Sequence, residues 1–535
     1  MMRGLILLLV LAGAVVAEDA VRPRLVLLVS IDQLRPDVLE RYAPLYTGGL
    51  KRLLADGARF PGLQDHGLTE TGPGHSALAT GCHPARTGIV ANSWIDPRTG
   101  RAVYCVEDPK VKRSPVLQLK PALGDWLKAV DPRSKVFSIS GKDRAAITMG
   151  GAGPDGVFWY AAGEKGFATS AYYEPRGRPS WLESFNADGW LDSLPRRWIH
   201  EVGKKARPDD DAHEAVRFSR TSPHRLRGKK AEFFYTALRY TPFVDAFTLR
   251  LARTIVDRFD LGGDESVDLL CLGLSATDTV GHLYGPYSQE VRDVVLRLDE
   301  WLGELFAHLE KRKTPFLVAL TADHGVLPFE NMKRFKLPSV VQRVRTAIRK
   351  TLGDGAWVFV RNGQIVVNRA LAKERGVAIE KIVEAARAAL LAERSVAAVY
   401  DRAALEGDSA GDEILARPRL EAKRFVLHLI LAETFDAIGA GAQRDEEVFL
   451  PGLDEDPPSL LVDDGHVAAG NLAPDRKPSG DERLVLFGQV GRLDVASDVR
   501  ARSQEENRQD ATSHRGQAAG HRCPTEARCP ARSPV

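Results

Sequence analysis

The chain has 535 residues, of which 44% are hydrophobic and 27% charged, and its net charge is +3. This is the composition of an ordinary globular protein, long enough for one large α/β domain with insertions or for two to three domains. The small net charge argues against nucleic acid as a specific partner and against an anionic membrane surface. The cysteines are too few and scattered for a disulfide scaffold, although one bridge, Cys82–Cys105, is feasible, and Cys271 is expected to be a buried thiol.

The N-terminus has the pattern of a secretory signal peptide. A short basic start is followed by an apolar run over residues 4–16, and small residues before Ala17 suit cleavage there. The run is too short for a membrane span, and no other stretch is apolar enough for one. We therefore expect residues 1–17 to be removed and the protein to be periplasmic or secreted, without stable insertion into a membrane.

Apolar runs alternate with helical patterns along the first three quarters of the chain. Helices are expected near residues 48–55, 71–80, 288–309 and 378–392, and a strand pair near Val358 and Val366. An aromatic, Gly-, Pro- and Arg-rich stretch over residues 150–260 is expected to form an insertion over the sheet. The runs that predict buried parallel strands are residues 24–31, 135–140, 267–274 and 315–321. The order predicts an α/β three-layer sandwich with a mostly parallel sheet.

One loop, over residues 69–75, turns into a helix that Gly81 is suited to end. We expect Thr71 to be the N-cap of this helix, with its hydroxyl beside unpaired backbone N–H groups. The N-terminus of a helix favours anions, phosphate above all. A plain helix cap is the commoner role of such a threonine. A catalytic role for Thr71 is therefore predicted only because of the other motifs in the sequence.

Acidic residues stand just past the ends of apolar runs, two of them with a histidine close by: Asp32, Asp278 with His282, and Asp323 with His324. The carboxyl ends of parallel strands are where α/β sheets bind ligands. Carboxylate and imidazole groups suit Zn²⁺ and need no thiolate. Each acid alone is more often a turn residue, but the joint pattern predicts a metal site.

Three further polar residues are candidates for holding phosphoryl oxygens: Asn92, Lys142 and Arg144. An arginine offers two parallel donors to an anion, and a lysine offers a point charge. Each of these residue types is more often exposed to solvent, so their role depends on where the fold places them.

Taken together, these motifs resemble those of the alkaline phosphatase superfamily, in the branch with a threonine nucleophile. That branch contains nucleotide pyrophosphatase/phosphodiesterases and certain periplasmic alkaline phosphatases. The resemblance spans residues 24–400. The motifs that carry it are Ser30-Ile31-Asp32-Gln33, Thr71-Gly72-Pro73-Gly74-His75, Asn92, Gly141-Lys142-Asp143-Arg144, Asp278 with His282, and Asp323-His324-Gly325.

The resemblance implies two zinc ions. One would be bound by Asp32, Thr71, Asp323 and His324, and the other by Asp278, His282 and a histidine near the C-terminus. Thr71 would be the nucleophile that forms a phosphothreonine intermediate. Lys142 and Arg144 resemble a pair found in the phosphatases and absent from the diesterases.

The last histidine of the implied set has no counterpart in a matching context. From about residue 418 the chain changes character, and after about 470 it has the composition of a disordered segment. One hypothesis is that the reading frame is lost near residues 415–420. The alternative is a divergent C-terminal region that supplies its own ligand, with His466 as the first candidate.

These observations predict a catalytic domain over residues 18–417 and an atypical region over residues 418–535. We expect a monomeric, zinc-dependent phosphate-monoester hydrolase that acts on small-molecule phosphate esters. The alternatives are a phosphodiesterase or nucleotide pyrophosphatase, and an impaired homologue that lacks the last zinc ligand.

Overall fold

The computed structural model describes residues 22–401 and the strand Ile430–Ala432. The predicted signal peptide and most of the region after residue 418 lie outside the described residues. Within residues 22–401, the positions left out are 61, 63, 65, 67, 97–98, 210, 212–213, 215–217, 227, 229–231, 327, 329–336, 362–363 and 394–398.

A six-stranded sheet with the order β12-β1-β11-β6-β7-β8 forms the centre of the fold. All neighbouring strands are parallel except β7 and β8. In the register of β1, Leu25 lies opposite Asp268 on one side and Phe316 on the other. The four predicted strands are therefore confirmed, and they are β1 (Leu25–Ile31), β6 (Val136–Ser140), β11 (Asp268–Leu274) and β12 (Phe316–Thr321), joined by β7 (Gly156–Ala161) and β8 (Gly166–Ala168).

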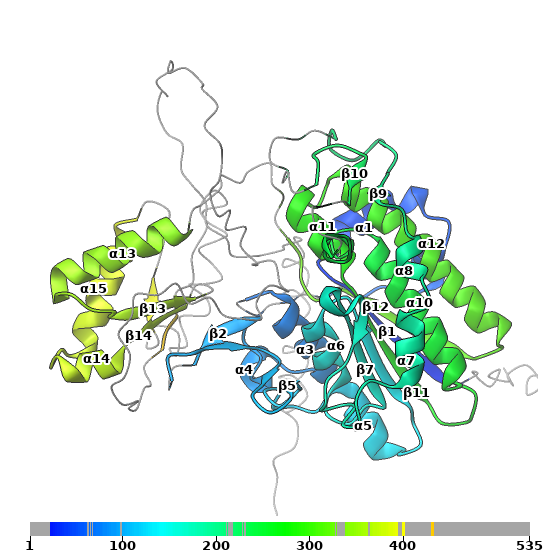
Figure 1. Ribbon diagram of the computed structural model, residues 1–535, viewed down its shortest axis with the longest axis horizontal. Helices are drawn as coiled ribbons and strands as arrows, with labels where there is room; N and C mark the ends of the chain where they lie inside the picture. The colour runs from blue at the N-terminus through cyan, green and yellow to red at the C-terminus, as the bar shows by residue number, and fades with distance from the viewer. Residues whose placement is uncertain are drawn as a thin grey trace, which may run out of the picture. The chain divides into compact units, whose positions relative to one another are not determined.

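Helices cover both faces of this sheet, which explains why its strands are apolar runs and not alternating patterns. Figure 1 shows α3 and α6 on one side of the strands and α10 and α12 on the other. Leu27 and Val29 pack with the second group, whereas Leu28 packs with the first. The three-layer sandwich is thus confirmed, with helices α3 (Thr71–Thr80), α5 (Leu123–Val130) and α6 (Asp143–Gly150) on one face and α10 (Phe243–Arg258), α11 (Ala276–Tyr284) and α12 (Gln289–Lys311) on the other.

The expected insertion over residues 150–260 is narrower than predicted. Its first part supplies β7 and β8 to the sheet, and its last part is the sixteen-residue helix α10. Buried aromatic rings such as Phe167 and Phe247 stack in the core, so the aromatic composition reflects packing. The shorter elements between them are α7 (Ser180–Asn186), α8 (Trp190–Ser193), β9 (Arg197–Trp198), β10 (His224–Arg225) and α9 (Phe233–Leu238).

The N-terminal half also holds short elements around the sheet. They are α1 (Pro36–Tyr42), a 3-10 turn (Ala43–Leu45), α2 (Gly49–Asp56), α4 (Pro84–Thr87), β2 (Ser93–Ile95), β3 (Ala102–Tyr104), β4 (Glu107–Asp108), β5 (Lys112–Arg113) and a second 3-10 turn (Ala162–Glu164).

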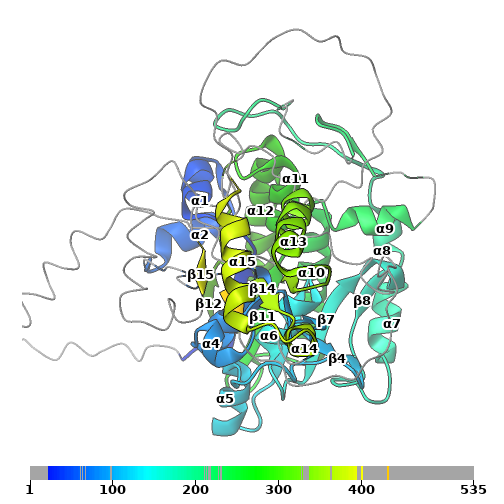
Figure 2. The same cartoon turned by 90° about the vertical axis from the view of Figure 1, so that its left-hand side faces the viewer.

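A second group of elements has its own sheet and its own apolar cluster around Trp357 and Ile382. The sheet order is β13-β14-β16-β15, and Figure 2 shows helices α13 and α15 running side by side. The predicted strand pair and helix are confirmed. The elements are α13 (Leu337–Leu352), β13 (Val358–Arg361), β14 (Gln364–Val367), α14 (Arg369–Glu374), α15 (Ile379–Leu391), β15 (Tyr400–Asp401) and β16 (Ile430–Ala432).

Of the helices in the described ranges, none is both long and apolar enough to cross a bilayer. The feasible bridge between Cys82 and Cys105 is not formed. Cys271 is fully buried in β11, as predicted.

Candidate active site

The acidic residues predicted at strand ends meet at the carboxyl edge of the central sheet. Asp32 follows β1, Asp323 follows β12, and Asp278 lies in the first turn of α11 after β11. His324 joins them, with its Nε2 atom 3.3 Å from Asp32 Oδ1, 3.5 Å from Asp323 Oδ2 and 3.8 Å from Asp278 Oδ1. His282 is one turn after Asp278 on α11, and its Nε2 lies 3.0 Å from Asp278 Oδ1. The structure therefore brings all five metal-ligand candidates of the strand ends together.

Thr71 is buried at the start of α3, but it is the first helical residue and the N-cap is Glu70. The expectation that Thr71 itself caps the helix was wrong by one position. Gly81 ends the helix with a φ of 66°, in the left-handed region that favours glycine, as predicted. Gly74 has no such φ, but a Cβ atom there would lie 2.5 Å from the carbonyl oxygen of Asp323. Because Gly74 has no side chain, α3 can lie this close to Asp323.

Lys142 and Arg144 reach the Thr71 hydroxyl from the start of α6. Their side chains are buried, although lysine and arginine usually stay exposed. Lys142 Nζ lies 3.2 Å and Arg144 Nη2 3.4 Å from Thr71 Oγ1. Lys142 Nζ also donates to Asp32 Oδ2 at 2.6 Å and to Asp278 Oδ2 at 2.5 Å. Two cationic side chains therefore border one hydroxyl in a buried site.

Asn92 is held against the same helix start by two hydrogen bonds. Its Oδ1 accepts from the backbone N–H of Gly72 at 2.7 Å, and its own backbone N–H donates to Glu70 Oε2 at 2.6 Å. The side-chain amide of Asn92 is thereby fixed at the residue that follows Thr71.

The ionisation of the site follows from burial and opposite charges. Burial alone lowers the pKa of His324, but the carboxylates of Asp323 and Asp32 outweigh it and raise that pKa to about 10. Burial likewise opposes the charge of Lys142, yet Asp278 and Asp32 raise its pKa above the usual value. Burial raises the pKa of Asp278, and the nearby His282 and Lys142 more than offset this and hold it well below its usual range.

The donor atoms fit bound metal ions. Two buried groups of three bring their ligand atoms within 4.8 Å of one another, Asp32 with His75 and Asp323, and Asp32 with Asp278 and His324. Nδ1 of His324 lies 3.0 Å from the carbonyl oxygen of Gly325. If an ion displaces the second proton that the carboxylates favour on His324, a proton on Nδ1 leaves the lone pair on Nε2, which faces the carboxylates as in histidine ligands of metals.

His282 belongs to neither group, and its side chain is 37% exposed. Within the described ranges, the structure thus places His282 in no group of three ligands, and the other histidine near Asp278 is His324 of the second group. His466 lies outside those ranges.

Sequence reasoning assigned no role to His75 or to Gln33, which both line the site. His75 is fully buried, its Nδ1 lies 2.9 Å from the carbonyl oxygen of Thr71, and it is 3.0 Å from Asp323 Oδ2. A histidine four residues after Thr71 lies on the same face of the helix, and this spacing was the available signal.

Gln33 has a φ of 67°, unusual for a residue with a side chain. Its backbone N–H donates to Asp323 Oδ1 and its side-chain amide to Asp278 Oδ1. A Cβ atom at Gly281 would lie 2.3 Å from Gln33 Oε1, so the glycine leaves room for this side chain. Gln33 therefore orients two of the three acids.

Comparison with known proteins agrees with this geometry. Residues 26–420 match the model of the type I phosphodiesterase / nucleotide pyrophosphatase family. The chain belongs to this family.

Several curated relatives are named alkaline phosphatases. The chain is 36% identical to PhoK from Sphingomonas sp over 62% of this chain and 60% of the relative. It is 35% identical to PhoV from Synechococcus elongatus over 61% and 63%, and 33% identical to PhoD from Zymomonas mobilis over 70% and 68%. The match to the first two relatives thus spans less than two thirds of their length.

A crystal structure of the alkaline phosphatase PafA has the same fold. It matches with a TM-score of 0.68 and 29% identity, over 72% of this chain and 80% of that one. The α/β sandwich with its mostly parallel sheet is therefore that of a PafA-like protein.

Proposed function

We propose that this chain is an exported, zinc-dependent phosphate-monoester hydrolase with Thr71 as its nucleophile. The observation that carries the proposal is the pair of buried cations at the Thr71 hydroxyl, Lys142 and Arg144. A phosphate monoester presents more anionic charge to such a pair than a diester does. The names of the relatives support the same substrate class.

In the proposed reaction, Thr71 Oγ1 attacks phosphorus while the bond to the leaving alcohol breaks, which gives a phosphothreonine. Water then attacks the phosphorus, frees Thr71 and releases inorganic phosphate. Arg144 and Lys142 neutralise the charge on the non-bridging oxygens, and the Asn92 amide is directed at the same group. Because these groups are already fixed by packing, little reorganisation is needed during the reaction.

The residues that would hold zinc are Asp32, Asp323 and His324 with Thr71 at one position, and Asp278 and His282 at the other. When bound, such ions lower the pKa of an attacking hydroxyl and stabilise a departing oxygen. His75 touches Asp323, and Gln33 contacts both Asp323 and Asp278, so these two residues are positioned to orient the ligands.

Two observations favour rival functions. The family description names phosphodiesterases and pyrophosphatases, and Lys142 already pairs with two carboxylates, which reduces the charge it offers to substrate. In addition, His282 lacks a further imidazole partner among the described residues, which favours an impaired homologue.

One comparison of rates separates these functions. The purified protein, with zinc present, is assayed on an aryl phosphate monoester and on the matching diester. The proposal expects the higher kcat/KM on the monoester. A higher value on the diester would establish the diesterase, and no turnover of either substrate by folded, zinc-loaded protein would establish the impaired homologue.

A further inference from the structure

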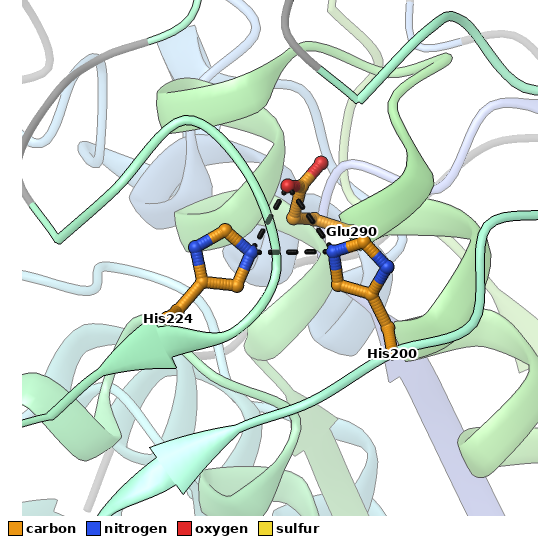
Figure 3. Close-up of side chains that lie close together, drawn as sticks. All are labelled: His200, His224 and Glu290. Carbon is orange, nitrogen blue, oxygen red and sulfur yellow. Dashed lines mark hydrogen bonds and ion pairs between the residues drawn. The ribbon is translucent and has the colours of Figure 1, made fainter.

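Two buried histidines and a buried glutamate converge at a place that shares no residue with the Thr71 site. His200 follows β9, His224 lies in β10, and Glu290 is in the first turn of α12. Figure 3 shows both imidazole rings pointing toward one carboxylate oxygen of Glu290. All three side chains are fully buried. A buried carboxylate costs much free energy unless a cation neutralises it.

The distances between the converging atoms are those of ligands around one small ion. The Nε2 atoms of His200 and His224 are 3.3 Å apart, and they lie 3.4 Å and 3.0 Å from Glu290 Oε1. Tetrahedral zinc with bonds of about 2.0–2.1 Å separates its ligand atoms by about 3.3–3.4 Å. The Asp209 carboxylate borders the group, with Oδ1 3.3 Å from His200 Nε2.

The surroundings of His224 offer its outer nitrogen an acceptor. Its Nδ1 lies 3.2 Å from the carbonyl oxygen of Ser219, which can only accept a hydrogen bond, and the hydroxyls of Ser219 and Tyr284, at 3.1 Å and 3.2 Å, can accept as well. A neutral His224 that donates from Nδ1 has its lone pair on Nε2, facing the carboxylate and the second imidazole. Lone pairs that face one another need a cation between them, and a carbonyl partner at the outer nitrogen is typical of histidine metal ligands.

We propose that His200, His224 and Glu290 form a structural site for a divalent ion of the zinc class. Two imidazole nitrogens and a carboxylate oxygen are donors that zinc accepts, and the burial of all three suits a closed structural site. The site joins the β9–β10 ribbon to the start of α12.

The same site contacts helix α11 at its C-terminal end. The hydroxyl of Tyr284, the last residue of α11, lies 3.2 Å from His224 Nδ1. Because α11 carries Asp278 and His282, the ion would hold the far end of the helix that presents these two residues.

Metal analysis of the full chain tests the proposal without any activity measurement. Wild type, Glu290→Gln and the control His308→Gln are dialysed against a mild chelator, and zinc is measured per folded chain. His308 is on the same helix and pairs with Asp257 at the surface. We expect Glu290→Gln to lose about one equivalent of zinc and the control to lose none. Equal zinc in wild type and a folded Glu290→Gln variant would overturn the proposal.

A second variant leaves the proposed site untouched and covers the case in which Glu290→Gln does not fold. Asp32→Asn with Asp278→Asn removes the shared acids of the Thr71 site. The double variant should retain about one zinc per chain, and cobalt in its place should give the strong visible bands of a four-coordinate site. If the folded double variant binds no metal, the cluster is a protonated imidazole–carboxylate group and the proposal fails. This test is independent of the proposed phosphatase activity. Zinc can be found at this site in a protein without that activity, and the activity can be found in a protein without zinc at this site.

Discussion

Thr71 Oγ1 is the single atom on which the proposed chemistry depends. Thr71→Ala removes the attacking oxygen and leaves the carboxylate and imidazole ligands in place, so monoester turnover should fall by about three decades or more with zinc content largely retained. The measurement is kcat/KM alongside metal analysis, with Thr69→Ala as the control. A Thr71→Ala variant of near-wild-type rate would shift the nucleophile to Thr69.

Arg144 and Lys142 should matter more for monoesters than for diesters. Each contact that strengthens in the transition state contributes about 2–4 kcal/mol, so the double alanine variant should lose several decades on the monoester and far less on the diester. Arg144→Ala alone is the cleaner variant, because Lys142 also pairs with Asp32 and Asp278. The exposed Arg133→Ala serves as the control. Equal losses on both substrates would mean that the pair has only a structural role.

For single residues, the sequence predicted which side chains lie close together but not how buried they are. Asp32, Asp323 and His324 could be found because each follows a strand whose apolar run is visible in the sequence. The burial of Lys142 and Arg144 could not, since it depends on the packing of α6 against α3, two elements about 70 residues apart in the chain.

At the scale of elements, α11 is held at its start by a side chain from α10. Asp245 is fully buried and accepts hydrogen bonds from the backbone N–H groups of Ser275 and Ala276, just ahead of Asp278. Asp245→Asn replaces one carboxyl oxygen, which keeps an accepting lone pair even when it is protonated, by an NH2 group that can only donate. We expect it to lower the free energy of unfolding by about 1–3 kcal/mol in urea titrations. Asp257→Asn, on the exposed face of the same helix, should change stability much less.

The stability difference between wild type and Asp245→Asn should depend on pH. Burial, only partly offset by the backbone hydrogen bonds, raises the pKa of Asp245 from 3.8 to about 7. A group whose pKa is higher in the folded state stabilises fully below its unfolded pKa, and this contribution is lost as the pH rises through 7. The deficit of the Asn variant should therefore be largest near pH 4 and shrink toward pH 8. A difference that grows with pH would show that the carboxylate is preferred in its charged form.

Among the elements, those with strong local signals were predicted well. Ser288 was expected to open the long amphipathic helix, and its side chain indeed accepts from the N–H of Val291 as the N-cap. The stretch over residues 150–260 was harder, because its strands β7 and β8 are short and buried along their whole length, so they show no alternating pattern. Its helix α10 does have a polar face, with Arg250, Arg253 and Asp257, so the helical period was present in the sequence and was missed among the surrounding aromatic residues.

For the whole molecule, the open question is the region after about residue 418. The family match ends at residue 420, close to the point where the composition changes, and both a lost reading frame and a divergent C-terminal region would end the match there. On the hypothesis of a lost frame, a chain of native frame would supply the third ligand that the described residues do not bring to Asp278 and His282. Translation of the other frames of the coding DNA should reveal a His-Gly-Pro-type motif, and its absence from every frame would contradict the hypothesis.

The chain as given should therefore be deficient in metal and activity relative to a frame-restored version. The zinc content of the Thr71 site is measured as the difference between each chain and its own Asp32→Asn/Asp278→Asn variant. We expect this difference to be about one equivalent in the 535-residue chain and about two in the frame-restored chain. Monoester turnover should rise in parallel, and solubility should improve. Two tightly held ions and full activity in the given chain would show that a residue after 418, with His466 first in line, already supplies the ligand.

The pairing of β1 with strands far along the chain delays its folding during synthesis. Leu25 lies opposite Asp268 and Phe316, so β1 finds its first neighbour only after roughly 240 more residues have been made, and its second after roughly 290. A ribosome working at about 5–20 residues per second needs on the order of 10–50 seconds for the first of these lengths, and during this interval β1 has neither of its own partners. The first strand to emerge is thus among the last to be enclosed, which makes a chaperone that shields residues 25–31 most useful in the first minute of the protein's existence.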